Sequence, residues 1–296
     1  MNTITAQNYA DEWLPNNKMS YFLETEHHIW HLQANCRIEN LKTKKTILFI
    51  HGLGSSVITW RDILPIYSDY NVIALDLPGH GLTRLKSSFR SSISTISDDI
   101  KKVLLSQKIK PHGIVGHSSG AAIALNLAFL LGDRVSFVVS INGSFENFDG
   151  LAGVFFPIFA KLLASTPLFG KVFSKINKSN TKVKKLLEIT GSTLDKKGID
   201  LYSKLIANPD HVSGTISMMA QWNHEELLPK IKHLSMNCLF ISGENDRIVH
   251  PDVSFRMYNR MKKSKFIKIE HLGHLMHEEN PKLIYEQIIN FIKEVS

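Results

Sequence analysis

Six short apolar runs recur along the chain, and longer stretches with helical spacing separate them. Continuous apolarity with β-branched residues is typical of strands that are buried on both faces of a parallel sheet. The alternation of such runs with helices indicates βαβ units, and therefore predicts an α/β fold with a mostly parallel sheet flanked by helices. The runs are TILFI (46–50), NVIALD (71–76), HGIV (112–115), VSFVVSIN (135–142), NCLFIS (237–242) and KFIKIE (265–270).

Two further patterns lie near the ends of the chain. Residues 20–33, SYFLETEHHIWHLQ, have the pattern of an antiparallel hairpin, which we expect at the edge of the sheet. Residues 281–295 have helical spacing, and Asn280 followed by Pro281 is a typical cap and first residue of a helix. The chain is therefore expected to end in a helix.

The regular spacing of the apolar runs breaks once, between residues 142 and 237. The intervening sequence contains no comparable run, and it shows helical periodicity punctuated by glycine and proline. We predict that residues 144–223 form a helical cap, or lid, inserted into the sheet domain. The α/β core would then consist of residues 1–143 and 224–296.

Composition and charge narrow the classes of partner. The chain is 43% hydrophobic and 21% charged, as expected of a folded globular protein. Its net charge of +8 and pI near 9.3 are compatible with anionic ligands, membranes or nucleic acid, but they are interpreted mainly as an aid to solubility. The charges are mostly dispersed and no nucleic-acid-binding module is recognisable, so no nucleic-acid partner is expected. The lysine-rich stretch 171–185 is interpreted as a solvated helix face.

The cellular setting expected from the sequence is the cytoplasm. Cys36 and Cys238 lie in separate contexts, so neither a disulfide framework nor a zinc site is predicted. The first residues include acids and no apolar run, so a signal peptide is not expected. The most apolar window, 151–169, contains a lysine and two prolines. A membrane-spanning helix is therefore not expected, whereas peripheral membrane contact through this apolar part of the cap stays open.

Glycine-rich motifs follow five of the predicted strands, where open α/β sheets bind their ligands. The pattern GHSSG (116–120) fits a nucleophile elbow, a strained strand-to-helix turn that exposes the hydroxyl of Ser118. Taken alone, the same five residues also fit a glycine-rich turn that begins a helix. The five motifs are HGLG (51–54), LPGHG (77–81), GHSSG (116–120), GENDRIV (243–249) and HLGHLMH (271–277).

The partners that a catalytic serine requires are present downstream in the expected order. A serine hydroxyl needs a base to accept its proton and a third group to orient that base. Asp246 follows the fifth apolar run and His274 follows the sixth, which is the chain order of a Ser-Asp-His triad on this type of fold. Ser118, Asp246 and His274 are therefore predicted to be nucleophile, acid and base.

Each of the two partners has rivals in the sequence. Asp76 ends the second run, but it precedes Ser118 and suits a structural turn. His271 is close enough to the sixth run to belong to the strand end, and His277 is near the start of the last helix. Gly273 allows the loop to turn His274 inward, so His274 is the preferred base.

A tetrahedral intermediate would need preorganised hydrogen-bond donors for its oxyanion. The expected donors are the backbone N–H groups of Ser119, directly after the nucleophile, and of Leu53 in the loop after the first long parallel strand. Gly52 and Gly54 would permit the close backbone approach that such a site requires. The alternative is that residues 51–54 form only a turn.

Other candidates concern the substrate pocket and the exclusion of cofactors. Met218, Met219 and Trp222 would line the pocket or close the cap against the sheet, and His117 is a further pocket candidate beside the nucleophile. No phosphate loop and no GxGxxG motif opening a helix is present, so nucleotide binding is not indicated. No cofactor or metal is expected. A serine at the elbow also argues against enzymes that use a carboxylate nucleophile, such as haloalkane dehalogenases and epoxide hydrolases.

The motifs together resemble the α/β-hydrolase superfamily across almost the whole chain. Residues 141–173 and 190–222, which span most of the predicted cap, resemble the BchO-type proteins, which are magnesium-chelatase accessory or bacteriochlorophyll-biosynthesis hydrolases. The resemblance implies the same roles for Ser118, Asp246 and His274, and a setting in magnesium-tetrapyrrole synthesis. Ser119 stands where alanine is more usual, which leaves the backbone donor in place. The motifs are FIHGLGSSVITWRDILP, LDLPGHG, VGHSSGAAIAL, SGENDRIV and LGHLMHEENP.

Three functional hypotheses remain open at this point. The first is a serine hydrolase that cleaves a carboxylic ester or related acyl bond through an acyl-serine intermediate. Its substrate would be a small hydrophobic ester or a tetrapyrrole bearing propionates or their ester. The second is a non-catalytic accessory protein that binds a tetrapyrrole or a chelatase partner. The third is a general carboxylesterase or lipase unrelated to pigments, and the complete triad spacing favours catalysis over mere binding.

Overall fold

The computed structural model describes residues 3–5, 13–86, 90–146 and 180–295. In these ranges the strands form one ten-stranded sheet in the order β1-β2-β3-β5-β4-β7-β8-β9-β10, and β6 pairs with β3 beside this path. The predicted α/β fold with a mostly parallel sheet is confirmed. The strands are β1 (Thr3–Thr5), β2 (Ser20–Glu24), β3 (His28–Ala34), β4 (Thr46–Ile50), β5 (Asn71–Leu75), β6 (Arg84–Leu85), β7 (Pro111–His117), β8 (Phe137–Ile141), β9 (Asn237–Gly243) and β10 (Ser264–Ile269).

The six apolar runs form six neighbouring parallel strands, which lie in the sheet in the order β5, β4, β7, β8, β9 and β10. Every residue of β4, β5 and β8 is buried, as continuous apolarity predicts for strands covered on both faces. β10 differs, because it pairs only with β9 at the edge of the sheet and leaves Lys265 and Lys268 exposed. The prediction of burial on both faces was wrong for this one strand.

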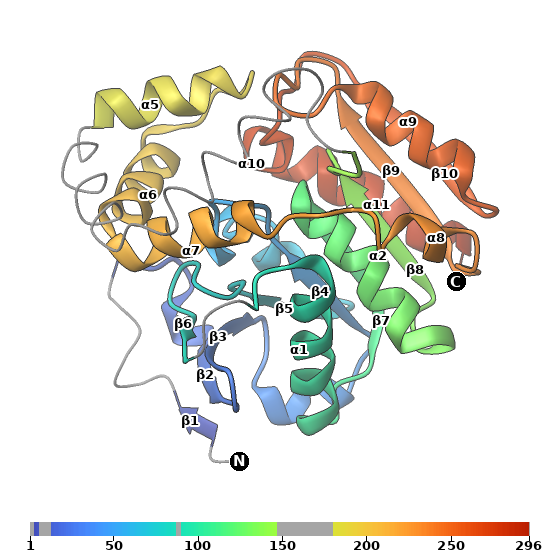
Figure 1. Ribbon diagram of the computed structural model, residues 1–296, viewed down its shortest axis with the longest axis horizontal. Helices are drawn as coiled ribbons and strands as arrows, with labels where there is room; N and C mark the ends of the chain where they lie inside the picture. The colour runs from blue at the N-terminus through green and yellow to red at the C-terminus, as the bar shows by residue number, and fades with distance from the viewer. Residues whose placement is uncertain (1–2, 6–12, 87–89, 147–179, 296) are drawn as a thin grey trace.

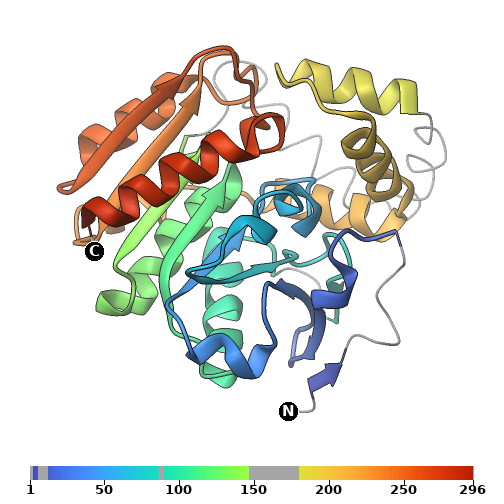
Figure 2. The same ribbon diagram turned by 180° about the vertical axis from the view of Figure 1, so that it is seen from behind.

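Helices cover both faces of the sheet, and each face has its own hydrophobic core. Figure 1 shows α1, α2 and α9 in front of the strands, and Figure 2 shows α11 across the opposite face. The predicted start of the last helix is confirmed, because the Leu283 N–H donates to Asn280 Oδ1 at 3.1 Å. The helices are α1 (Ile93–Ser106), α2 (Ser119–Leu131), α5 (Asn180–Ile189), α6 (Lys196–Ala207), α7 (Pro209–Ala220), α8 (Leu228–Ile231), α9 (Pro251–Arg260), α10 (Met276–Glu279) and α11 (Pro281–Val295).

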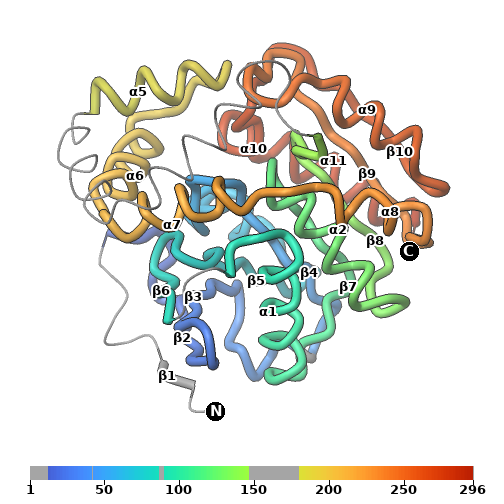
Figure 3. The backbone as a smooth tube through the Cα atoms, viewed as in Figure 1, coloured from blue at the N-terminus to red at the C-terminus, as the bar shows by residue number. Residues whose placement is uncertain are grey.

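Helices α5, α6 and α7 belong to the segment predicted as a cap, and they lie together to one side of β9 and β10 (Figure 3). Residues 147–179 of that segment are outside the described ranges, with the apolar window 151–169 and most of the lysine-rich stretch. The division of the chain into core and cap therefore stays a prediction. No helix in the described part of the chain has both the length and the apolarity needed to cross a membrane.

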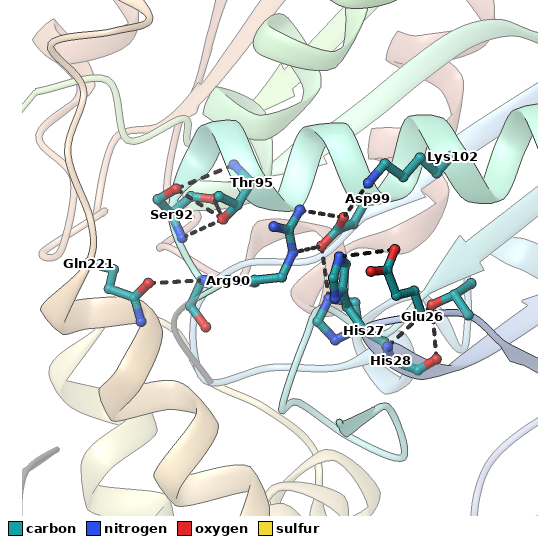
Figure 4. A network of polar contacts seen from close by, with 11 residues as sticks. Glu26, His27, His28, Arg90, Ser92, Thr95, Asp99, Lys102 and Gln221 are labelled. Carbon is teal, nitrogen blue, oxygen red and sulfur yellow. Dashed lines mark hydrogen bonds and ion pairs between the residues drawn. The ribbon is translucent and has the colours of Figure 1, made fainter. Parts of the chain in front are cut away.

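The predicted hairpin, β2 with β3, lies one strand inside the edge of the sheet, because β1 pairs with β2, and a cluster of polar side chains joins the hairpin to α1 (Figure 4). Asp99 of α1 contacts His28 Nε2 at 3.0 Å, and it accepts two hydrogen bonds from Arg90 at 2.7 and 2.6 Å. Burial alone would raise the pKa of Asp99, but the hydrogen bonds from His28 and Arg90 outweigh burial and lower this pKa to about 2. The ionised carboxylate therefore stabilises the packing of the hairpin on α1.

Asp99→Asn is expected to lower the free energy of unfolding at pH 7 by about 1–2 kcal/mol, allowing for solvent screening. A lowered pKa stabilises the fold above the unfolded-state value near 4, and this contribution is lost as the pH falls towards 2. Urea unfolding should therefore show a smaller difference between variant and wild type at pH 3 than at pH 7. Asp98→Asn, at an exposed neighbouring position, is the matched control. An equal difference for Asp99→Asn at both pH values would contradict the assignment.

Candidate active site

Ser118 lies at the sharp turn between β7 and α2. Its backbone has φ 53° and ψ −121°, a region that residues other than glycine rarely adopt. The Ser118 N–H donates to the Ile141 carbonyl at 2.9 Å, and its carbonyl accepts the Ala121 N–H at 3.0 Å. The neighbouring strand and the first turn of α2 therefore hold the strained residue in place, as a nucleophile elbow requires.

The two glycines of the GHSSG motif are required by the close contact between strand and helix. A Cβ at Gly116 would lie 2.4 Å from the Gly120 carbonyl oxygen and 2.6 Å from Ala121 N. A Cβ at Gly120 would lie 2.3 Å from the Ile50 carbonyl oxygen and 2.5 Å from that of His51. These neighbours are backbone atoms that cannot rotate away. The motif therefore sets how closely α2 approaches β4 and β7.

His274 and Asp246 are paired at the ends of the last two parallel strands. His274 Nδ1 lies 2.7 Å from Asp246 Oδ2, and both residues are buried. The other carboxylate oxygen, Oδ1, accepts the N–H groups of Ile248 at 2.8 Å and Val249 at 2.9 Å. A carboxylate can only accept hydrogen bonds, so Nδ1 carries a proton and Nε2 is the ring nitrogen that can act as a base.

Asn142 and His117 hold the loop that carries His274 through hydrogen bonds to its backbone. Asn142 Nδ2 donates to the His274 carbonyl at 2.9 Å, and His117 Nε2 lies 2.9 Å from the same oxygen. Burial is the main cause that lowers the pKa of His117 well below its usual value, and the neighbouring histidines lower it further. This ring is therefore neutral at pH 7. His117 therefore positions the loop, whereas Asn142 was missed by the sequence analysis although it directly follows β8.

The structure distinguishes His274 and Asp246 from their rivals. Asp76 is buried in a turn, where it binds His31 Nδ1 at 2.7 Å and the N–H groups of Val57 and Leu82, in agreement with a structural role. His271 is exposed just beyond β10. His277 is fully buried in α10, and its Nε2 lies 2.6 Å from Thr59 Oγ1. None of these three residues is part of the His274–Asp246 pair.

The two residues expected to bind an oxyanion lie side by side, but they are bonded to each other. The Leu53 N–H donates to the side-chain Oγ of Ser119 at 2.8 Å. Ser119 is the first residue of α2, so its own N–H is one of those that have no partner within the helix. A Cβ at Gly52 would lie 3.0 Å from the Cβ of Ser118, which explains the glycine at this close approach.

A cavity of about 690 Å³ lies over Ser118 and His274. Met219 and Trp222 line this cavity, whereas Met218 is fully buried in the hydrophobic core. The position of Met218 corresponds to the alternative in which it packs against the sheet, because consecutive helical residues point in different directions. The described lining consists of Leu53, Gly54, Ser55, His117, Ser118, Ser119, Ser144, Glu146, Leu186, Leu187, Thr190, Tyr202, Ile206, Met219, Ala220, Gln221, Trp222, Asn223, Glu225, Ile248, Val249, His274 and Leu275.

One polar group of this cavity was not found from the sequence. Tyr202 of α6 donates to Glu278 Oε1 at 2.7 Å and accepts from Ser55 Oγ, while Glu278 forms a buried ion pair with Arg61. Burial raises the pKa of Tyr202 well above its usual value, and the nearby Glu278 carboxylate raises this pKa further. The tyrosine is therefore a neutral donor that ties α6 to the floor of the site.

The described residues offer no cluster of side chains suited to bind a metal ion. No group of three or more His, Cys, Asp or Glu side chains in the described residues is arranged to hold a metal ion. Cys36 and Cys238 are both free thiols. Burial raises the pKa of Cys238 to about 12, so this thiol is uncharged at pH 7.

The fold and the matching residues define the class of protein. Residues 45–281 match the family described as alpha/beta hydrolase fold, and the chain belongs to this family. The esterase EaEST from Exiguobacterium antarcticum has a similar fold, with a TM-score of 0.73 and 17% identity over 92% of this chain and 99% of that one.

Two relatives place the sequence more narrowly within the family. The chain is 36% identical to the magnesium-chelatase 30 kDa subunit of Rhodobacter capsulatus, over 78% of this chain and 81% of that protein. It is 27% identical to the uncharacterized hydrolase YugF of Bacillus subtilis, over 84% of this chain and 90% of that protein. The resemblance to magnesium-chelatase accessory proteins expected from the motifs is thus confirmed at the level of sequence.

Proposed function

We propose that this chain is a serine hydrolase that cleaves a carboxylic ester or related acyl bond through an acyl-serine intermediate. The observation that carries the proposal is the placement of Ser118 on a strained elbow in the same cavity as the buried His274–Asp246 pair. A hydrolase is the expected function of an esterase-like fold, but the fold by itself does not assign the chemistry. The proposal rests on the residues of the site.

In the proposed reaction, the Ser118 hydroxyl attacks the carbonyl carbon of the ester and His274 Nε2 accepts its proton. Asp246 stabilises the imidazolium through the bond to Nδ1. The protonated His274 then gives its proton to the departing alcohol oxygen as the ester C–O bond breaks. Water attacks the acyl-serine with His274 again as base, and the carboxylic acid and free serine are restored.

The reaction requires a contact that forms during binding. Among the described residues, no hydrogen bond joins the side chains of Ser118 and His274, although both face the cavity. Such bonds are often long in the absence of substrate and shorten in the Michaelis complex. We therefore expect the Ser118 hydroxyl to reach His274 Nε2 in the complex with substrate.

The walls of the cavity favour a substrate with an apolar acyl or alcohol part. Leu186 and Leu187 of α5, Ile206 of α6 and Met219 of α7 line the cavity, and Trp222 lines it from the segment after α7. Burial of apolar surface contributes roughly 25 cal/mol per Å². We therefore infer a small hydrophobic ester as the substrate class, which a cavity of about 690 Å³ can hold.

A fluorophosphonate probe tests the proposed nucleophile directly. The wild type should gain the mass of one phosphonyl group, because the activated serine displaces fluoride from phosphorus. Ser118→Ala should gain none, whereas Ser136→Ala, which removes an exposed serine hydroxyl outside the cavity, should react like the wild type. Intact-mass spectrometry measures all three. An unlabelled but folded wild-type protein would refute the proposal.

A second candidate function is favoured by the sequence similarity to the magnesium-chelatase 30 kDa subunit. In this case the cavity would bind a magnesium tetrapyrrole or its ester, either as the substrate of the same serine or without turnover. Titration of a porphyrin methyl ester into Ser118→Ala, followed by absorbance and fluorescence, separates binding from hydrolysis. Saturable binding without turnover by the wild type would favour the accessory role, and hydrolysis of the ester would unite the two functions.

A further inference from the structure

The side chain of Ser119 accepts a hydrogen bond from the Leu53 N–H, which is one of the two oxyanion donors that the proposed reaction needs. Its Oγ accepts the Leu53 N–H at 2.8 Å, a normal hydrogen-bond distance. Ser119 is only 5% exposed, and both residues line the cavity beside Ser118. The hydroxyl is therefore held at the site and is not a surface group that happens to pass close to Leu53.

This contact matters because of the number of hydrogens available. A backbone amide has one hydrogen, and an oxyanion hole works only when its donors point at the position of the developing negative charge. While the Leu53 N–H is directed at Ser119 Oγ, it is not free to point at a substrate oxygen. The hydroxyl of Ser119 thus stands in the place of a ligand oxygen, next to the backbone N–H of the same residue at the start of α2.

We propose that the Ser119 hydroxyl is a latch on the oxyanion hole, which must rotate off the Leu53 N–H before the carbonyl oxygen of a substrate can bind there. The inference rests on the proposed hydrolase function. Because the serine side chain turns about one bond, the latch opens without a backbone movement. Ser119 is a positioning residue in this account, since it controls the donor and does not react with the substrate.

The latch makes a quantitative prediction for Ser119→Ala. Breaking one neutral hydrogen bond inside a protein costs about 0.5–1.5 kcal/mol net, which corresponds to roughly two- to twelvefold in a binding or rate constant. Removal of the hydroxyl should therefore strengthen oxyanion binding by a factor within this range, and we take its central part, roughly three- to tenfold, as the expected result. Alanine favours helix more than serine does, so this variant should fold.

A pair of inhibitors isolates the effect on the oxyanion. An alkyl trifluoromethyl ketone accepts the Ser118 oxygen at its carbonyl carbon, the hydroxyl proton passes to His274, and the carbonyl oxygen becomes the bound oxyanion. The corresponding trifluoromethyl alcohol has nearly the same shape and forms no oxyanion. Ser119→Ala should lower the ketone inhibition constant roughly three- to tenfold and leave the alcohol constant unchanged.

The possible outcomes separate the latch from the proposed function. If the wild type binds the ketone but Ser119→Ala binds it equally or more weakly, the latch is refuted and the hydrolase function stands. Weaker binding would mean that the Ser119 hydroxyl itself donates to the oxyanion. Equal tightening for ketone and alcohol would show a general change of the cavity, which also overturns the latch. If the wild type binds no ketone and Ser118 is not labelled by the fluorophosphonate, both proposals fail.

Discussion

If the proposed serine-hydrolase function holds, Asp246→Asn is expected to lower kcat for ester hydrolysis, and kcat/KM with it, by about 10,000-fold, as the same replacement does to kcat in a well-studied Ser-His-Asp protease. The asparagine side chain would keep the Oδ1 that accepts the N–H groups of Ile248 and Val249. Its amide nitrogen would then face His274 Nδ1, where the carboxylate oxygen now lies at 2.7 Å. Two N–H groups cannot donate to each other, so the ring would have to carry its proton on Nε2. An imidazole in that form cannot accept the Ser118 proton.

The matched comparison is His274→Ala, which removes the base altogether. Loss of the base costs about a millionfold in kcat in the best-studied serine hydrolase series, and effects within a triad are not additive. The double variant should therefore be no slower than His274→Ala alone. The backbone oxygen of His274, which holds His117 and Asn142, is retained in both variants, so their thermal unfolding midpoints should remain close to that of the wild type.

The size of the fall in kcat/KM for Asp246→Asn distinguishes between two possible roles of Asp246. If Asp246 served only to fix the loop after β9, the asparagine would preserve that function through its Oδ1, and kcat/KM would fall by less than about tenfold. Steady-state kinetics on a p-nitrophenyl ester, with active sites counted by the fluorophosphonate, provide the measurement. A loss below about tenfold in the folded variant would refute the proposed orientation of His274.

The sequence was most informative where the physical requirement is local. Continuous apolarity identified the buried parallel strands because alternate residues of β4, β5 and β8 point to opposite faces of the sheet and all of them are buried. GHSSG indicated a tight strand-to-helix turn because backbone contacts with α2, β4 and the residue after β4 leave no space for a Cβ at either glycine. The pairing of Asp246 with His274 followed from chain order, since parallel strands bring their carboxyl ends to one edge of the sheet.

Features that depend on the packing of distant segments could not be predicted in the same way. The bond between the Leu53 N–H and Ser119 Oγ depends on the rotamer of one serine at the meeting point of two loops. The Tyr202–Glu278 bond joins residues from α6 and α10, and no local pattern indicates it. Met218 and Met219 are adjacent residues of the same type, so the sequence does not distinguish them. The rotation of α7 against the sheet decides which one faces the cavity.

Gly120→Ala is expected to destabilise the protein by about 3 kcal/mol or more, although alanine is the better helix former by about 1 kcal/mol. The new Cβ would lie 2.3 Å from the Ile50 carbonyl oxygen and 2.5 Å from that of His51, so α2 would have to move away from β4. The start of α2 carries Ser118 and Ser119, and its displacement should also slow fluorophosphonate labelling. Urea unfolding and labelling rates measure the two effects on the same sample.

Gly132→Ala at the other end of α2 is the control that separates steric clash from backbone strain. Gly132 has φ +60°, and a Cβ there would meet no atom within 4 Å. Its replacement should cost only the conformational strain, on the order of 1–2 kcal/mol, and should leave labelling unchanged. Gly120 sits within the helix, so its cost arises from contact alone. A Gly120→Ala variant as stable as the wild type would show that α2 can shift freely, and then the close contact between helix and strand could not be what holds Ser118 in its strained conformation.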